Sequence, residues 1–317
     1  MTVHVIVDYS FLYYKYKFQL DSGRMRRLTA ELRNEYGDIE EKDVSQIYYS
    51  IREIEGFRRK LEQVGHDVIV SICFDMKSKR KDIKEGASEA EAEAASNYKS
   101  NRVSRLTEED FKNIRLVEKI LSKAGYNTYR IDGLEADDII SYIVSEYSES
   151  FDYNIIYTPD ADLLVNIRGN VGASRYKSSY GYSMVDRSTF ESYCSREFKC
   201  YMPYNAIMLY KATCGDASDC IAGIKRFGPK AFDKLVKYLT EEKGVNWEEC
   251  GTFEKTCELL EKCRGYLTDE QIEQAYASLS MVRPAEIKCE IEKPTKYSDE
   301  QLRKDAYSEY GMKSLIA

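Results

Sequence analysis

Acidic residues stand at the ends of apolar runs, or in close pairs, at five places in this 317-residue chain. One follows the run VHVIV, one follows VIVSICF, and the others belong to the segments GLEADD, TPDADLL and GDASD. Carboxylates that converge repel one another unless protons or hard cations neutralise them. The pattern therefore predicts a site for two divalent metal ions, a kind of site that mostly cleaves or forms phosphodiester bonds. The candidate metal ligands are Asp8, Asp75, Glu135, Asp137, Asp138, Asp160, Asp162, Asp216 and Asp219.

The segment GLEADDII carries more acid than the start of a helix needs. Apolar residues recur at helical spacing from Ile139 to Val144, which places Glu135, Asp137 and Asp138 in the first turn of a helix. The helix dipole favours anions there, but one capping acid would satisfy that turn. A single acid after a strand is explained as a helix cap, whereas three acids in one turn favour a binding site.

A parallel sheet would bring these distant acids together. In the first two-thirds of the chain, short apolar runs of strand type alternate with segments at helical spacing. We expect strands at 3–7, 67–74, 126–131 and 153–158, and helices at 44–64, 107–124 and 135–147. This succession predicts an α/β fold with a twisted, mainly parallel sheet flanked by helices. Residues at the C-terminal ends of its strands lie at the mouth of the sheet, where such folds bind ligands.

The rest of the chain has a different pattern. Residues 171–185 are typical of a hairpin, and from about residue 203 the pattern is helical, with a glycine-rich interruption at 215–228. We therefore place one domain at 1–203 and a second, helical one at 204–317.

Composition limits the class of protein. No run of about eighteen apolar residues is present, so we expect no membrane span, and the short apolar N-terminus predicts a strand rather than a signal peptide. Nine cysteines without CxxC spacing indicate reduced thiols of a cytoplasmic protein, not a zinc site. The net charge of −7 does not exclude DNA, because the nine candidate ligands account for more than all of it.

Four blocks of the sequence resemble the 5′–3′ exonuclease and flap endonuclease family in its bacterial and bacteriophage form. They are NYKSNR, GLEADD, TPDADLLVNI and GDASDCIAGIKRFGPKAF. Their order and rough spacing agree with the family from residue 3 to about 240. The resemblance implies a PIN-like nuclease domain over 1–203, followed by a helix–three-turn–helix at about 215–240 that holds duplex DNA.

The resemblance also divides the acids between two Mg²⁺ or Mn²⁺ ions. One ion would lower the pKa of a bound water and direct it at the scissile phosphorus, and the other would stabilise the leaving 3′-oxygen. The acids implied around the first ion are Asp8, Asp75, Glu135, Asp137, Asp138 and Asp160, and those around the second are Asp162, Asp216 and Asp219.

Basic residues of the resembling blocks are candidates for phosphate contacts. Lys99 and Arg102 of NYKSNR could hold the scissile phosphate and stabilise charge in the transition state, and Lys211 matches a lysine of the family pattern. The basic stretch that contains Arg80 fits the start of an arch, at about 77–105, through which a single-stranded 5′ end passes.

The segment 215–240 supplies the candidate contacts to duplex DNA. Its glycines permit close approach to phosphates, and its lysines outnumber its acids. The family resemblance adds K⁺ as a candidate ion at this motif. Tyr98, beside Lys99, is a candidate for stacking on a terminal base, as is Tyr9. The DNA-binding candidates are Arg80, Tyr98, Gly223, Lys225, Arg226, Gly228 and Lys230.

Two departures from the family pattern stand out. The acidic stretch EGASEAEAEAAS at 85–96 lengthens the arch, and it indicates a solvated helix or mobile insertion without a packed face. In addition, the family's GIG hairpin reads Arg226–Phe227–Gly228, with one glycine lost.

The leading hypothesis is a metal-dependent 5′ nuclease that acts on flap, nicked or 5′-ended duplex DNA, and also on RNA in RNA–DNA hybrids during primer removal. We expect a monomer in the cytoplasm (the host cytoplasm if phage-encoded), with replication proteins as candidate partners. Two alternatives remain: a PIN-type ribonuclease, which would not need the motif at 215–240, and a catalytically silent DNA-binding protein. Retention of all nine acids favours the enzyme.

Overall fold

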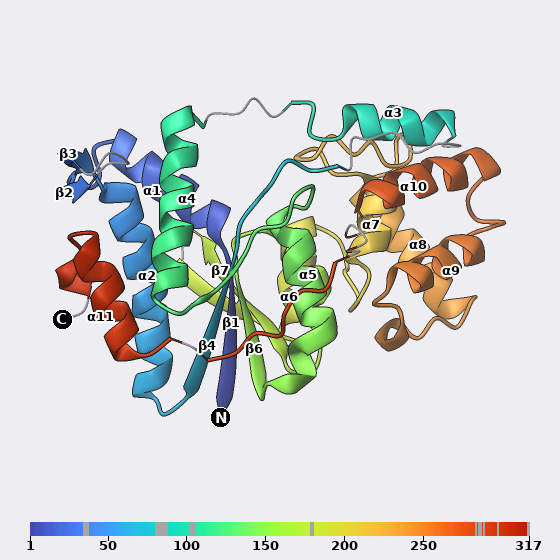
Figure 1. Ribbon diagram of the computed structural model, residues 1–317. Coiled ribbons are helices and arrows are strands. Elements are labelled where there is room, and N and C mark those ends of the chain that lie inside the picture. Colours follow the sequence, from blue (N-terminus) through green and yellow to red (C-terminus); the bar gives the residue numbers. More distant parts are fainter. Residues whose placement is uncertain are drawn as a thin grey trace.

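A six-stranded sheet forms the centre of the protein (Figure 1), with strand order β5–β4–β1–β6–β7–β8. The computed structural model describes residues 1–33, 38–79, 88–101, 106–177, 181–282, 284, 287, 289–296 and 298–315. All neighbouring strands of this sheet are parallel except β7 and β8, which form an antiparallel hairpin. The strands are β1 (Thr2–Asp8), β4 (Asp67–Cys73), β5 (Asn127–Tyr129), β6 (Tyr153–Tyr157), β7 (Val171–Lys177) and β8 (Gly181–Val185).

Side chains of the central strand β1 alternate between two hydrophobic cores. Val3, Val5 and Val7 belong to one core, and Ile6 belongs to the other. This alternation follows from the two-residue period of a strand, and the nearly continuous apolar sequence reflects helices on both faces.

Helices from distant parts of the sequence cover the two faces. The face of Val3, Val5 and Val7 packs against α1 (Tyr9–Asp21), α2 (Ser45–Gln63), α4 (Glu108–Lys123) and α11 (Glu300–Glu309). The other core contains residues of α5 (Ala136–Tyr147), α6 (Phe190–Phe198), α7 (Ile207–Cys214), α8 (Pro229–Glu241), α9 (Phe253–Lys262) and α10 (Asp269–Val282). A separate two-stranded sheet consists of β2 (Thr29–Arg33) and β3 (Ile39–Asp43). Within the described ranges, no helix is both long and apolar enough to cross a membrane.

The last part of the chain returns to the first domain. Asn127 exchanges hydrogen bonds with the backbone of Thr295, and the Tyr307 hydroxyl donates to Glu55 at 2.5 Å. Helix α11 therefore packs on α2 and α4 rather than beside α7–α10. The boundary at residue 203 stays a prediction, but residues 298–315 lie with the sheet domain. No sequence pattern indicates this return, because it depends on partners 168 and 252 residues away.

Most expected elements agree with the structure within a few residues, including the four strands, the three helices and the hairpin. The elements α1, β2, β3 and α6 were not expected from the residue pattern. Helix α1 mixes buried and exposed tyrosines, so its apolar pattern is weak. The acidic stretch does form a helix, α3 (Glu89–Asn97), but it packs against α10. The expectation that it has no packed face was therefore wrong, since alanines let the two helices approach closely.

His4, in the middle of β1, gives the fold a predictable response to acid. Its ring is fully buried and lies within hydrogen-bonding distance of Asn154 and Ser71. Burial lowers the pKa of His4 from 6.5 to about 3. The unfolded chain therefore takes up this proton first, and stability falls as pH drops below about 6.5. At pH 4.5 we expect a loss of up to about 2–3 kcal/mol from this group.

Urea unfolding from pH 7 to 4.5, in wild type and His4→Gln under one metal condition, measures this effect. The variant is less stable at pH 7 but should lose less stability on acidification. Parallel pH profiles for the two proteins would contradict the prediction.

Candidate metal centre and nucleic-acid interface

Three candidate ligands lie at the carboxyl ends of three adjacent strands. Asp8 is the last residue of β1, Asp75 follows β4 by two residues, and Asp160 follows β6 by three. Strand β1 lies between β4 and β6, with Asp8 in register with Cys73. The three acids therefore converge at one edge of the sheet, the position where open α/β sheets place ligands.

The start of α5 brings the GLEADD acids to the same edge. The backbone N–H of Ala136 donates to Asp75 Oδ1 at 2.7 Å, which fixes this helix to the end of β4. Ligand atoms of Glu135, Asp137 and Asp138 all lie within 4.8 Å of one another. Asp138 is buried and accepts a hydrogen bond from the Glu135 N–H at 3.1 Å, so it also caps the helix.

The first group of acids is poorly neutralised by the protein itself. Burial, followed by repulsion from Asp75 and Asp160, raises the pKa of Asp8 to about 8. Burial and then repulsion from Asp162 raise the pKa of Asp160 to about 7, although part of its surface meets solvent. Burial also raises the pKa of Asp75.

Among the described residues, no lysine or arginine forms an ion pair with Asp8, Asp75, Asp137 or Asp160. A set of oxygen donors that carries excess negative charge is the set that hard divalent cations prefer. The residues present therefore fit Mg²⁺ or Mn²⁺.

The second group of acids is arranged differently. Asp162 lies in a short 3₁₀ helix, η2 (Asp162–Asn166), and Asp216 follows α7. The ammonium group of Lys211 forms ion pairs with both, at 2.7 Å from Asp216 Oδ2. Asp216 also accepts hydrogen bonds from the backbone and side chain of Ser218.

Lys99 links the two groups. Its ammonium group lies 2.5 Å from Glu135 Oε1 and 3.8 Å from Asp219 Oδ2. Its backbone N–H donates to the carbonyl of Asp219, and its φ of 49° is a left-handed value that costs about 1–3 kcal/mol in a residue with a side chain. The fold holds Lys99 at the acids in spite of this strain.

The two tyrosines considered for base stacking are core residues. Tyr98 is 1% exposed and donates a hydrogen bond from its hydroxyl to Glu135 at 3.0 Å. Tyr9 is equally buried and packs against Phe74. Their rings are covered by the protein, so the stacking prediction does not fit this conformation.

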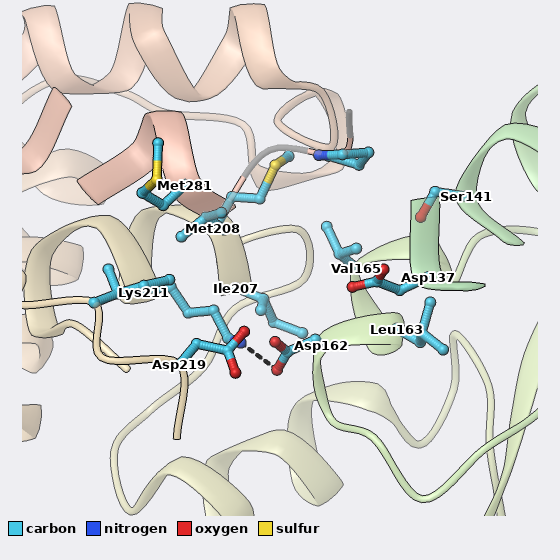
Figure 2. A pocket seen from close by; sticks show the side chains of 13 residues that line it. Asp137, Ser141, Asp162, Leu163, Val165, Ile207, Met208, Lys211, Asp219 and Met281 are labelled. Atoms are coloured by element: carbon cyan, nitrogen blue, oxygen red, sulfur yellow. Dashed lines mark ion pairs between the residues drawn. The ribbon is translucent and has the colours of Figure 1, made fainter. Parts of the chain in front are cut away.

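A shallow pocket joins the acids to the helical region. Figure 2 shows Asp137, Asp162 and Asp219 around it, with Lys211 directed at Asp162 and Met208 and Met281 on the opposite wall. The pocket is lined by residues of α5, η2, α7 and α10. Leu163, Val165 and Ile207 lie among the acids, so the lining mixes polar and apolar side chains.

Three of the predicted DNA contacts are exposed in the loop between α7 and α8 and in the first turn of α8. Lys225, Arg226 and Lys230 are all exposed, and Pro229 begins α8 directly after Gly228. Space around Gly228 is open. Arg226 has a φ of 61°, so it takes the left-handed conformation that a glycine would adopt more easily.

Gly223 has an internal role instead. Its N–H donates to Ser278 Oγ, and an added Cβ would lie 2.3 Å from the Gly215 nitrogen. The missing side chain lets the loop close on itself, so the predicted approach of a phosphate at Gly223 does not fit this geometry.

Two predicted residues, Arg80 and Arg102, lie outside the described residues. The described part of the arch region, 77–79 and 88–101, is attached at further places besides the contacts of Tyr98 and Lys99. Helix α3 packs on α10, and Asn101 Nδ2 lies 3.5 Å from the Ala217 carbonyl. In Figure 1, α3 lies above α10, far from α4, to which the chain next runs.

Three residues that position the acids were missed in the sequence. Ser10 donates to Asp75 Oδ2 at 2.5 Å, and the buried Thr158 donates to Asp8 Oδ2 at 3.1 Å. Arg175 of β7 is 4% exposed and donates hydrogen bonds to the carbonyl of Pro159, the residue before Asp160. It therefore holds the loop that carries Asp160. The adjacency of Ser10 to the Asp8 motif and of Thr158 to the Asp160 motif could have pointed to the first two. Nothing in the sequence links Arg175 to this loop.

Mg²⁺ is expected to stabilise the protein, because it relieves repulsion among the first group of acids. An ion that binds only the folded state stabilises by about 2.7 kcal/mol at one hundred times its Kd. Differential scanning fluorimetry in EDTA and in millimolar Mg²⁺ measures the change in Tm, with Na⁺ at matched ionic strength as control. An unchanged Tm would contradict a preformed metal site.

A parallel sheet with acids of three adjacent strands at its carboxyl edge, continued by a helical region that contacts them, defines a 5′ nuclease fold. The chain belongs to the 5′–3′ exonuclease family. The sequence model for "5′-3′ exonuclease, N-terminal resolvase-like domain" matches residues 4–193, more than half of the chain.

Curated relatives agree with this assignment. The chain is 31% identical over 200 residues to DNA polymerase I of Synechocystis sp., which covers 59% of this chain and 19% of the polymerase. It is 30% identical over 178 residues to the 5′-3′ exonuclease of Aquifex aeolicus, covering 54% of this chain and 58% of that protein. The chain thus spans less than two thirds of each of these relatives.

Solved structures share the fold. A structure of the T5 D15 protein co-crystallised with metal ions has a TM-score of 0.56 and 17% identity, covering 88% of this chain and 86% of that one. The bacteriophage T5 D15 flap endonuclease in complex with DNA and metal ions has a TM-score of 0.53 and 17% identity, with the same coverage.

Proposed function

We propose that this protein is a divalent-metal-dependent 5′ nuclease that hydrolyses phosphodiester bonds near the 5′ ends of flap, nicked or primer-bearing duplex DNA. One observation carries the proposal: Asp8, Asp75, Asp137 and Asp160 converge from separate elements and, within the described residues, form no ion pair with a lysine or arginine. Family membership and the T5 D15 complex with DNA and metal ions support the choice of substrate.

In this proposal the nine acids hold two Mg²⁺ or Mn²⁺ ions. The bound metal would supply an activated water and would neutralise charge on the phosphate. Ser10 and Thr158 hold Asp75 and Asp8 in place, since each donates a hydrogen bond to one carboxylate oxygen. The Arg175 contact with the Pro159 carbonyl fixes the position of Asp160. The protein therefore fixes its own ligands before the substrate arrives.

The Lys99 ammonium group is placed to contact the scissile phosphate. It lies between Glu135 and Asp219, and its side chain is 13% exposed, so a small part of it is open to an anion. Electrostatic stabilisation by a fixed cation is strongest in such a water-poor site. Arg102 would act beside it, and Arg80 would contact the single strand within the arch at about 77–105.

The exposed cations of the α7–α8 loop and of the first turn of α8 would hold the duplex. Lys225, Arg226 and Lys230 contact phosphates in this proposal, and K⁺ binds at the same loop. Contacts of this kind fix the position of the duplex without reading its sequence. The helical region of 204–282 serves as the duplex-binding part, with RNA–DNA hybrids as further substrates.

The biological setting of the proposal is primer removal during replication. In this proposal the protein is a monomer that acts in the cytoplasm together with replication proteins.

End-labelled flap, nicked, single-stranded and hybrid substrates test the proposal, with Mg²⁺, with Mn²⁺ and with EDTA. We expect metal-dependent release of short 5′ products from flap and nicked DNA, and none from Asp160→Asn. Cleavage of single-stranded RNA alone would favour a PIN-type ribonuclease. Tight DNA binding without cleavage under any metal condition would favour a silent DNA-binding protein.

Lys230→Ala should weaken binding to duplex substrates of any sequence. Lys230 lies exposed in the first turn of α8, next to the open Gly228. Loss of one phosphate contact should reduce the slope of log K against log salt by about 0.9. Fluorescence anisotropy between 50 and 200 mM salt measures it. Lys237→Ala, on the same helix but paired with Glu241, is the control. Equal effects of the two variants would reject a specific duplex contact at Lys230.

A further inference from the structure

The two groups of acids differ in how the protein balances their charge. Asp8 and Asp75 accept hydrogen bonds from the neutral side chains of Thr158 and Ser10, whereas Asp162 and Asp216 share the ammonium group of Lys211. The Lys211 side chain is only 4% exposed, and the exposed fractions of Asp162 and Asp216 are 31% and 14%. The second group thus already contains a cation that belongs to the chain.

The surrounding structure holds the Lys211 ammonium group between Asp162 and Asp216. It lies in the last turn of α7, where its neighbours Ala212 and Thr213 are fully buried. Gly215 ends the helix with a φ of 78°, and the chain then turns so that Asp216 meets the lysine five residues before it. Asp162 reaches the same nitrogen from the loop after β6, as Figure 2 shows. A buried ammonium group needs such partners, because its desolvation is otherwise very costly.

An ammonium group and a divalent ion compete for these two carboxylates. Both need the same oxygens at short range, and a divalent ion close to a buried ammonium group is repelled in a site of low dielectric. In the first group Lys99 pairs with Glu135, but among the described residues Asp8, Asp75, Asp137 and Asp160 form no ion pair with a lysine or arginine. The two halves of the centre should therefore differ in their affinity for metal.

We propose that Lys211 is a built-in cation at the Asp162–Asp216 side of the centre, so that the DNA-free protein binds one divalent ion tightly, at the Asp8 side. The second ion binds well only when the Lys211 ammonium group leaves these carboxylates. A backbone phosphate of the nucleic-acid substrate is an anion that can draw it away. This inference rests on the proposed metal-dependent function and adds an order of metal loading to it.

Mn²⁺ titration of the DNA-free protein, followed by the EPR signal of free Mn²⁺, counts the bound ions. Wild type should show one tight ion and a second at least ten-fold weaker. In Lys211→Met, which keeps the apolar stem but removes the charge, the affinity for the second ion should rise at least ten-fold. Lys211→Arg should keep the wild-type pattern, and Lys237→Met, a distant exposed lysine, is the control.

The same variants are compared by thermal unfolding. Lys211→Met leaves two carboxylates unbalanced, so its Tm in EDTA should fall and its Tm gain on adding Mn²⁺ should exceed that of wild type. If Lys211→Met does not fold, Mn²⁺ binding to Asp162→Asn tests the inference instead. The tight ion should be retained in Asp162→Asn and lost in Asp8→Asn.

Three results overturn the inference: two ions of similar affinity in wild type, an unchanged second ion in Lys211→Met, or loss of the tight ion in Asp162→Asn. These results leave the nuclease proposal intact if cleavage still depends on metal. Absence of both metal binding and metal-dependent cleavage in wild type would instead reject the metal centre itself.

Discussion

Asp8→Asn is expected to abolish cleavage while stabilising the metal-free protein. Asp8 ends the central strand, and its neighbours Asp75, Asp137 and Asp160 are all acidic. Removing its charge removes a metal ligand, and a metal that supplies several kcal/mol of transition-state stabilisation makes the loss at least about 10³-fold in kcat. In EDTA the same change relieves repulsion in a buried site, so Tm should rise. Single-turnover cleavage of a nicked substrate and thermal unfolding in EDTA give the two readouts.

Opposite signs of the two effects separate this prediction from simple misfolding. Asp305→Asn, an exposed acid on α11, is the control and should change neither quantity. Mg²⁺ should raise the Tm of Asp8→Asn less than that of wild type. A variant that is inactive and also less stable in EDTA would show that Asp8 serves the fold rather than a metal ion.

Lys99→Met should lower kcat by about 10²–10³-fold, the typical loss when one fixed donor to a developing charge is removed. The effect on substrate binding should be smaller. Methionine keeps the apolar stem and most of the length but removes the ammonium group, including its cation–π contact with the Tyr98 ring. The strained backbone at residue 99 is unchanged, because both residues carry a Cβ. Pre-steady-state kinetics on a flap substrate measure kcat, and anisotropy in Ca²⁺ measures binding.

A control shows whether the loss in kcat comes from the charge of Lys99 and not from a general effect of replacing lysine by methionine. Lys123→Met, in which an exposed lysine loses its partner Glu309, is the control and should retain full activity. If Lys99→Met lowered affinity as much as kcat, Lys99 would bind ground state and transition state equally. Full activity would remove Lys99 from the site.

Short-range pattern was sufficient for much of the fold. The runs VHVIV and VIVSICF form strands, as expected for short runs of β-branched residues that are buried on both faces of a sheet. The positions of Asp8 and Asp75 at the strand ends follow from where those runs end. The acids of GLEADD lie at a helix start for the same local reason. What local pattern cannot supply is charge balance between elements. Lys211 pairs with Asp162 from another part of the chain, and Arg175 holds the carbonyl before Asp160.

Residue types and their spacing thus determined the parallel sheet, the ends of its strands and the acids that stand there, since these depend on neighbours within a few residues. Tertiary structure decided which acids have a cation and which do not, that Tyr98 and Gly223 serve the interior, and that α11 returns to the first domain. Such contacts join residues tens to hundreds of positions apart. Their geometry is set by packing of whole elements, which no segment of sequence specifies alone.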